Sequence, residues 1–424
     1  MRIVSNQSEI RIESDQGGLS IKQVKEGLKK SIQNRNLKKV LIVPPDITRL
    51  NSGAGLITAL YYELLENIHV DVLPALGTHK PMTRKEQITF FGDRIPPERF
   101  LIHEWRGGVS KIGEIPGDYV KEVSYGLMDE KIDIEISNYL LDPSYDLILS
   151  IGQVVPHEVA GMANYTKNIV VGCGGSQIIN QSHMLGACHG MESIMGKDHS
   201  PVRKVFDYAE EFFISKLPLL YILTVTVNSG NNTDIIGLYI GKERSGFTSA
   251  VKLSQKNNIV YMDAPIKTFV VWLDEHEFHS TWLGNKAIYR TRMAIADGGH
   301  LIILAPGIRM FGEDAENDRI IRKFGYIGKE KILSLCKTEP ELQNNLSAAA
   351  HLIHGSSEGR FKVTYATCKL KKEEIEGVAF DYIPLDEAMK KYDPKKLKQG
   401  INRLPDGEEI YYIENPAMGL WTVK

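Results

Sequence analysis

The sequence has no excess of charge of either sign, because 51 Lys and Arg residues stand against 53 Asp and Glu residues, for a net charge of −2. A nucleic-acid groove or an anionic membrane surface is normally matched by a basic surplus. Aromatic residues make up only 8% of the chain and do not alternate with basic runs, which disfavours single-strand binding. We therefore expect a small-molecule ligand, and neither a nucleic-acid nor a membrane partner.

Cysteines and long apolar runs are scarce as well. The four cysteines (Cys173, Cys188, Cys336 and Cys368) are far apart and form no CxxC pair, which excludes a disulfide scaffold and indicates reduced thiols. No run approaches the roughly 20 apolar residues of a membrane helix. The first residues lack the apolar core of a secretion signal. These absences predict a soluble, cytoplasmic protein.

Short apolar runs alternate with helical patterns through the first half of the chain. Strands are expected at 40–43, 70–76, 147–151 and 169–171, with helices near 57–65 and 203–216, and a hairpin of strands 221–227 and 235–240 around the turn 229–233. Strand–loop–helix alternation is typical of an α/β fold with mostly parallel sheets flanked by helices.

The second half repeats this pattern. Strands are expected at 269–272, 301–304 and 362–366, and helices near 285–297, 316–324 and 343–354. A chain of 424 residues exceeds one ordinary core. We expect an N-terminal α/β domain over 1–265 and a C-terminal α/β domain over 266–399, with the active site in the cleft between them. Residues 400–424 form a segment that could return to the first domain.

Polar clusters follow several of the predicted strands. Pro44-Pro45-Asp46-Ile47-Thr48-Arg49 follows the first strand, Gly77-Thr78-His79-Lys80-Pro81 the second, and His157 the third. Ligands in parallel α/β sheets bind outside the carboxyl ends of the strands, so these clusters predict an enzyme site. Each cluster alone has a simpler interpretation, as a turn with an Asp cap or as a surface histidine.

The chemistry of these side chains suits inversion at carbon. Two imidazoles on opposite sides of a ligand, His79 and His157, could remove a proton from one face and deliver one to the other, because a histidine pKa of about 6.5 allows both forms near neutral pH. Arg49 could hold a carboxylate through two parallel hydrogen bonds. Asp46 could orient a histidine or bind a hydroxyl.

Lys167 lies ten residues after His157 and sixteen before His183. Zinc sites use His, Cys and carboxylates rather than lysine. A lysine in this setting indicates a covalent link to a cofactor or carbonyl, or a contact with an anion. The nearby Gly172–Gly175 run resembles a phosphate loop but lacks the full Walker or dinucleotide spacing.

Taken together, these motifs resemble the nickel-pincer lactate racemase family. The family pattern is a D-x-T-R loop and a G-x-H-[RK]-P loop, then a histidine, a lysine ten residues on and a second histidine sixteen further. The matching segments here are Asp46-Ile47-Thr48-Arg49, Gly77-Thr78-His79-Lys80-Pro81, His157, Lys167 and His183.

The resemblance implies that the first domain carries nickel in a nickel-pincer nucleotide (pyridinium-3-thioamide-5-thiocarboxylic acid mononucleotide) bound covalently to Lys167. His183 would be the nickel ligand from the protein, and His79 and His157 the acid/base pair. Asp46, Gly174 and Gly175 would be further cofactor contacts. The implied reaction inverts C2 of a 2-hydroxy acid by reversible proton-coupled hydride transfer, and cofactor-biosynthesis proteins would be needed for loading.

The second half departs from the lactate enzymes. Their Gln and Lys, three residues apart, correspond to a segment that contains Arg290 and Arg292 here, either of which could contact the substrate carboxylate. Their ring-stacking tryptophan has no match around 342–346. A Gly-Gly-Arg run is replaced by residues 162–166, among them Tyr165, a further expected substrate contact. We therefore expect a polar substrate, a sugar acid (aldonate) before malate-like diacids or lactate.

Two other functional classes remain open at this point. One is a zinc-dependent hydrolase or lyase with His79, His157 and His183 as ligands, which predicts zinc and an unmodified Lys167. The other is a non-catalytic nucleotide- or cofactor-binding protein that holds its ligand at Gly172–Gly175, and it predicts retention of the ligand without chemistry. The racemase hypothesis alone uses the lysine.

Overall fold

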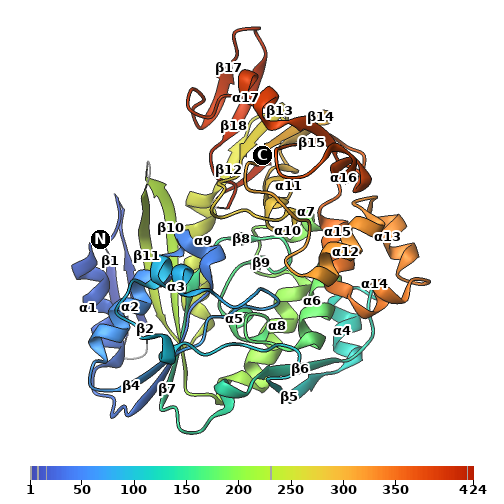
Figure 1. The fold of residues 1–424 in the computed structure, drawn as a ribbon. Helices are drawn as coiled ribbons and strands as arrows, with labels where there is room; N and C mark the ends of the chain where they lie inside the picture. Colours follow the sequence, from blue (N-terminus) through green and yellow to red (C-terminus); the bar gives the residue numbers. More distant parts are fainter. Residues whose placement is uncertain (1, 7–8, 16, 230–231, 418) are drawn as a thin grey trace. The chain divides into compact units, whose positions relative to one another are not determined.

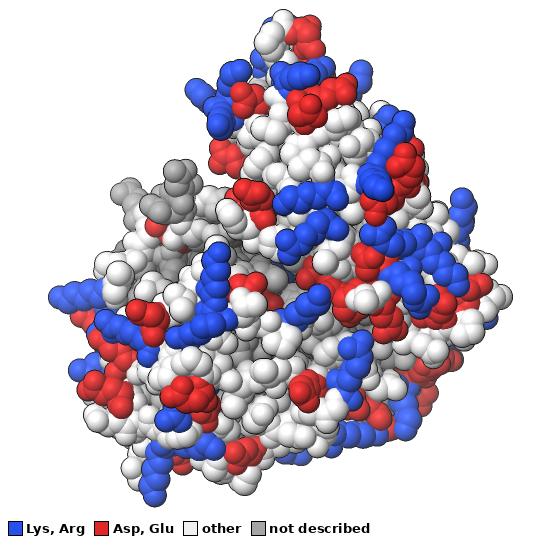
Figure 2. Space-filling view, in the orientation of Figure 1, with Lys and Arg blue, Asp and Glu red and all other residues white. Residues whose placement is uncertain are grey.

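The computed structural model describes residues 2–6, 9–15, 17–229, 232–417 and 419–424, which divide into two compact units (Figure 1). Unit 1 comprises Met1–Leu185 and Ile194–Asn258, and unit 2 comprises Gly186–Ser193 and Ile259–Lys424. Both units combine parallel-rich sheets with flanking helices, so the predicted α/β class is confirmed. Basic and acidic side chains are interspersed on the face drawn in Figure 2. Across the described parts of the chain, no helix is long and apolar enough to cross a bilayer.

Unit 1 is built on a seven-stranded sheet with the order β1-β2-β11-β10-β7-β3-β4. Strands β10, β7, β3 and β4 are parallel, and β11, β2 and β1 continue the sheet in antiparallel pairs. The strands are β1 (Arg2–Asn6), β2 (Glu9–Glu13), β3 (Lys39–Val43), β4 (His69–Val72), β7 (Leu147–Gln153), β10 (Leu219–Ser229) and β11 (Asn232–Gly241). The expected hairpin is confirmed, although residues 230 and 231 of its turn lie outside the described residues.

The central strands of unit 1 are apolar because both faces of the sheet are covered. Successive side chains of a strand point to opposite faces. Val40 and Ile42 therefore pack in one core with residues of α1 and α2, whereas Leu41 and Val43 pack in a second core with residues of α8 and α9.

The remaining elements of unit 1 surround this sheet. Two small antiparallel pairs are β5 (Val109–Ile115) with β6 (Ile132–Ser137) and β8 (Pro156–His157) with β9 (Gly161–Met162). The α-helices are α1 (Ile21–Ile32), α2 (Ala54–Leu64), α3 (Arg84–Phe91), α4 (Gly117–Val123), α5 (Thr166–Val170), α6 (Ser176–His189), α8 (Pro201–Phe212) and α9 (Arg244–Asn258). Short 3₁₀ segments are η1 (Ile47–Ser52), η2 (Pro97–Arg99), η3 (Asn138–Leu141) and η4 (Ile214–Lys216). The last residues of α6 belong to unit 2, as does most of α7 (Met191–Ile194).

Unit 2 has a six-stranded sheet with the order β16-β15-β14-β13-β18-β17, parallel except for β17. Its strands are β13 (Ile266–Trp272), β14 (Ile295–Leu304), β15 (Lys362–Thr367), β16 (Asp381–Pro384), β17 (Gly400–Arg403) and β18 (Glu409–Ile413), and β12 (Ile259–Met262) pairs separately with β19 (Leu420–Val423). Its helices are α10 (Thr281–Gly284), α11 (Lys286–Thr291), α12 (Ala315–Phe324), α13 (Lys329–Leu335), α14 (Pro340–Asn344), α15 (Leu346–His354), α16 (Lys372–Gly377) and α17 (Leu385–Lys391).

Three sequence-based expectations about the fold are wrong. Residues 169–171 lie in and just after helix α5 rather than in a strand, because a short buried β-branched run fits either structure. The helix expected over 285–297 ends at Thr291, and β14 already begins at Ile295. Residues 400–424 do not return to unit 1, because β18 and β17 complete the sheet of unit 2 beside β13 and β19 pairs with β12.

Candidate functional site

The site lies at one edge of the unit 1 sheet, where three parallel strands end. Strands β7, β3 and β4 are neighbours, so the loops after Gln153, Val43 and Val72 leave from the same edge. The first two of the predicted clusters contact each other, because Asp46 Oδ2 lies 2.6 Å from His79 Nδ1, and Ala75 N, two residues before the second cluster, donates to Pro44 O at 2.8 Å. In addition, Gly77 N donates to Gly172 O at 2.8 Å. The topology therefore brings Asp46, His79 and His157 to one edge, as predicted from the sequence.

Asp46 and His79 form a hydrogen-bonded pair. Asp46 caps η1 by accepting from Thr48 N at 3.1 Å and Thr48 Oγ1 at 2.5 Å, and its Oδ2 lies 2.6 Å from His79 Nδ1. Burial raises the pKa of Asp46, but the charge and hydrogen bond of His79, with help from Thr48 and Arg49, outweigh burial, and the pKa is lowered. The ionised carboxylate therefore accepts the Nδ1–H of His79, which makes Nε2 the basic ring nitrogen.

His157 is held in the opposite tautomer. Its ring is 4% exposed, and its Nδ1 accepts from the backbone N–H groups of Val159 at 3.1 Å and Ala160 at 3.4 Å. Because backbone N–H groups only donate, Nδ1 carries no proton and the neutral ring has its proton on Nε2. Glu158 Oε2 is 3.7 Å from the same Nδ1. One histidine of the pair thus has a basic Nε2 and the other a protonated Nε2.

Lys167 lies in the short helix α5, among the charged groups of this edge. Burial lowers the pKa of Lys167 to about 8, with a further decrease from Arg49 and Arg203 and an opposing increase from Glu158 and Asp46. An amine with this pKa is partly neutral at pH 7 to 8 and can act as a nucleophile. The structure thus places an activated lysine beside Arg49 and Asp46.

His183 on α6 has the features of a metal ligand. Its Nδ1 donates to Ile179 O at 2.6 Å, one helical turn earlier, so the Nε2 lone pair faces away from the helix carbonyl. Burial lowers the pKa of His183 to about 4, with a smaller decrease from Lys167. The ring is neutral at physiological pH, the state that binds metal.

Glu158 is a charged group of this site that the sequence-based prediction left out. It raises the pKa of both Lys167 and His183, which places its charge near both side chains. Its position directly after His157 was the available signal. Within the ranges that the structure describes, no three His, Cys, Asp or Glu side chains are grouped so as to hold a metal ion. His79, His157 and His183, the ligands of the zinc alternative, therefore do not form such a group in these ranges.

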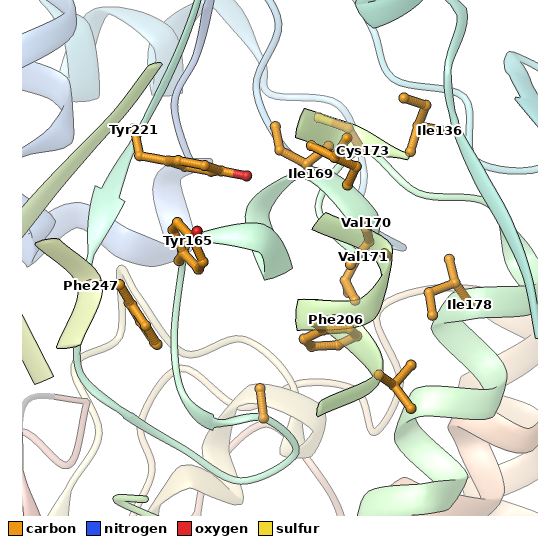
Figure 3. Packing of buried hydrophobic residues seen from close by; sticks show 14 of the residues in the cluster. Ile136, Tyr165, Ile169, Val170, Val171, Cys173, Ile178, Phe206, Tyr221 and Phe247 are labelled. Carbon is orange, nitrogen blue, oxygen red and sulfur yellow. The ribbon is translucent and has the colours of Figure 1, made fainter. Parts of the chain in front are cut away.

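Several predicted contacts have other surroundings in the structure. The Tyr165 ring is 3% exposed and lies against Tyr221 and Phe247 in the core of unit 1, so its expected role as a substrate contact has no support (Figure 3). Close packing explains Gly174 and Gly175, because a Cβ there would overlap the Val170 carbonyl and the Glu135 side chain, respectively.

The two candidate arginines for the substrate carboxylate belong to unit 2. Arg290 is fully buried on α11. Arg292 is 3% exposed, and its Nε lies 2.6 Å from Glu192 Oε1. Its Nη1 donates to the carbonyls of His354 at 3.1 Å and Ser356 at 3.2 Å. These bonds account for Arg292 without a ligand.

Comparison with known proteins agrees with the fold and the motifs. Residues 19–196 match the family described as the lactate racemase N-terminal domain. The lactate racemase of Thermoanaerobacterium thermosaccharolyticum is 24% identical over 281 residues, which are 63% of this chain and 60% of that protein. The match thus spans less than two thirds of the curated relative.

Two solved structures share the fold. A crystal structure of a protein from Thermotoga maritima has a TM-score of 0.82 and 26% identity, and the superposition covers 97% of this chain and 100% of that one. The lactate racemase apoprotein of T. thermosaccharolyticum has a TM-score of 0.65 and 18% identity, with 96% and 93% covered. Fold and site thus define an α/β protein with a histidine–lysine cluster at its strand ends. By this similarity residues 19–196 correspond to a lactate racemase N-terminal domain, and the chain shares the fold of a lactate racemase apoprotein.

Proposed function

We propose that this protein is an isomerase, a racemase or epimerase that inverts C2 of a small-molecule 2-hydroxy acid. The observation that carries the proposal is the opposite protonation of two histidines in unit 1. His79 has a basic Nε2 because Asp46 accepts its Nδ1–H, and His157 has a protonated Nε2 because Nδ1 accepts backbone N–H groups. One group can take a proton while the other gives one, as inversion requires.

The residues at this edge fit a nickel-pincer nucleotide. Lys167 offers an amine whose pKa is lowered to about 8, and His183 offers a neutral imidazole whose Nδ1 is already bonded to Ile179 O. Lys167 would hold the nucleotide covalently and His183 would bind its nickel. When bound, the nucleotide supplies a site that accepts a hydride from C2 and returns it. Loading would depend on cofactor-biosynthesis proteins.

The chain's own side chains then have separate roles. His79 Nε2 takes the substrate hydroxyl proton, and Asp46 stabilises the imidazolium that forms. His157 gives its Nε2 proton to the product oxygen on the opposite face, and the two histidines exchange roles in the reverse reaction. Arg49 fixes the carboxylate. Arg290 remains a second proposed carboxylate contact.

An aldonate is the proposed substrate, ahead of malate-like diacids and lactate. The pocket polarity expected from residues 164–166 does not support this choice, because Asn164, Tyr165 and Thr166 are 8%, 3% and 0% exposed. The choice therefore rests on the departures of the second half from the lactate enzymes. Faster inversion of lactate than of any polyhydroxy acid in a substrate panel would contradict it.

The test of the reaction is His79→Ala and His157→Ala in cofactor-loaded protein. Both variants should keep the mass increment on Lys167 and lose C2 inversion by about 10²- to 10⁴-fold, the usual contribution of general acid–base catalysis. His69→Ala is the matched control, because His69 also pairs with an aspartate, Asp71, on the same sheet. Normal turnover by His79→Ala would refute the two-base account.

A further inference from the structure

The backbone directly before Lys167 has an unusual conformation. Asn164 and Tyr165 have φ values of 64° and 57°, and Tyr165 has a ψ of −135°. Residues with a side chain rarely adopt positive φ, and two in succession persist only where the surroundings hold them. Helix α5 starts at the next residue, Thr166, and Lys167 follows. The strained turn therefore sets the direction in which α5 presents Lys167.

Arg203 holds this turn from helix α8. Its side chain is 0% exposed, and its Nη2 donates to Met162 O at 2.6 Å and Asn164 O at 3.4 Å. Its guanidinium carbon lies 4.6 Å from the centre of the Phe247 ring. The first carbonyl lies two residues before Asn164 and the second is that of Asn164 itself, so Arg203 holds the start of the positive-φ pair Asn164–Tyr165.

Burial of the Arg203 guanidinium in the core costs folding free energy. Its Nε and Nη1 have no hydrogen-bond partner among the described residues. A buried cation with unbonded donors stabilises a fold less well than an apolar side chain of similar volume. A role in stability alone does not explain an arginine at this position. Its hydrogen bonds to the Met162 and Asn164 carbonyls do explain it.

Other contacts fix the same segment at both ends. Before Lys167, the Tyr165 ring stacks on Phe247 with centroids 5.0 Å apart (Figure 3). A side chain at Gly152 would overlap the Asn164 amide. After Lys167, the Asn168 amide donates to Val43 O at 3.1 Å and to Ser150 Oγ at 3.0 Å. The lysine thus stands on a backbone that is held on both sides.

We infer that Arg203 is a positioning residue for Lys167, which holds the Met162 and Asn164 carbonyls so that the strained turn presents the lysine amine for cofactor attachment. The inference rests on the proposed function of Lys167. The positive charge of Arg203 also favours attachment, because it lowers the pKa of Lys167 and so increases the neutral amine. Its effect on this pKa is smaller than those of burial and Arg49.

The test compares Arg203→Met, Arg203→Lys and Arg244→Met. Arg244 is the matched control, because it also lies over Phe247, at 5.7 Å, but bonds to Asp198 and Asp207 instead of the turn. Two quantities are measured by peptide mass spectrometry. One is the pH dependence of acetic anhydride labelling at Lys167 in cofactor-free protein, and the other is the mass increment at Lys167 in protein from a cofactor-producing host.

Wild type should label half-maximally near pH 8, in line with the pKa of Lys167 of about 8. Arg203→Met should shift this midpoint upward. It should also lower cofactor attachment by roughly 10- to 100-fold, because misplacement of a reacting group by about 1 Å can cost about 10²-fold in rate. Arg203→Lys should keep the midpoint and still lower attachment, because one ammonium cannot replace the planar guanidinium. Arg244→Met should change neither quantity.

A rescue experiment separates positioning from core filling. Glycine adopts positive φ at little cost, so Asn164→Gly should restore part of the attachment that Arg203→Met loses. Wild-type attachment and midpoint in folded Arg203→Met, or no rescue by Asn164→Gly, would overturn the inference. If wild type labels near pH 8 but gains no mass increment in a host with a loaded lactate racemase control, the proposed function fails instead.

Discussion

Replacing Asp46 by asparagine should stop the reaction and leave the fold intact. Asp46 is 3% exposed, and its Oδ2 lies 2.6 Å from His79 Nδ1. An asparagine can still accept the bonds of Thr48 through Oδ1, but its NH₂ group then faces His79 as a donor. The imidazole must move its proton to Nε2, which removes the basic nitrogen that the proposed reaction uses.

The size of the effect follows from these contacts. A hydrogen bond to a charged group contributes about 1.5–3 kcal/mol, which corresponds to roughly 10- to 150-fold in rate. The wrong tautomer adds to this loss, and the same Asp-to-Asn change in a Ser-His-Asp triad lowers kcat by about 10⁴. We expect C2 inversion by Asp46→Asn to fall by about 10²- to 10⁴-fold, measured by chiral chromatography on cofactor-loaded protein.

Asp71→Asn is the control for this prediction. Asp71 is also buried, and its Oδ2 lies 2.9 Å from His69 Nε2 and accepts from Tyr145 Oη at 2.8 Å. The Asp71→Asn variant should lose stability without losing turnover.

Because the pKa of Asp46 is lowered from 3.8, its charge stabilises the fold above that pH, and this contribution is lost as the pH falls below it. Turnover by loaded, folded Asp46→Asn above one tenth of wild type would refute the reasoning.

Three further predictions concern metal binding, stability and pH. His183→Ala should keep the mass increment at Lys167 but lose nickel in metal analysis, and loss of the increment would contradict separate roles for the two residues. Arg292→Met should lower the free energy of unfolding by about 2 kcal/mol in urea titrations. This loss is smaller than for a fully buried pair, because Glu192 is 42% exposed. Unchanged stability with a raised KM would instead indicate a substrate contact. Burial lowers the pKa of His103 to about 4, so stability should be full above pH 6.5 and fall as the pH drops toward 4. His103→Gln should reduce that fall in thermal melts, and an unchanged pH dependence would count against a neutral, buried His103.

The position of the candidate site at one edge of the sheet could be predicted from the sequence, because the strands and the polar clusters after them are local patterns of residues. Strands β3 and β7 are mostly apolar, as expected of strands covered on both faces, and a polar cluster follows each within a few residues. Parallel pairing then brings the loops that carry Asp46, His79 and His157 to the same edge of the sheet.

The other features of the site and fold could not be predicted, because they depend on contacts between distant parts of the chain. The tautomer of His157 depends on how the backbone at Val159 and Ala160 turns, which no residue pattern specifies. The sequence around Tyr165 indicates a polar pocket residue. In the structure its ring stacks on Phe247, which comes from a helix far along the chain. The run 169–171 is β-branched, and only its packing in the core of unit 1 makes it helical rather than extended (Figure 3).

Intact-protein mass spectrometry with metal analysis tests the central claim most directly, on protein made in a host that synthesises the cofactor. The account predicts a mass increment that maps to Lys167, accompanied by stoichiometric nickel, and its absence in Lys167→Ala. An unmodified Lys167 with bound zinc, from a host that loads a known lactate racemase, would contradict the account and favour a hydrolase or lyase.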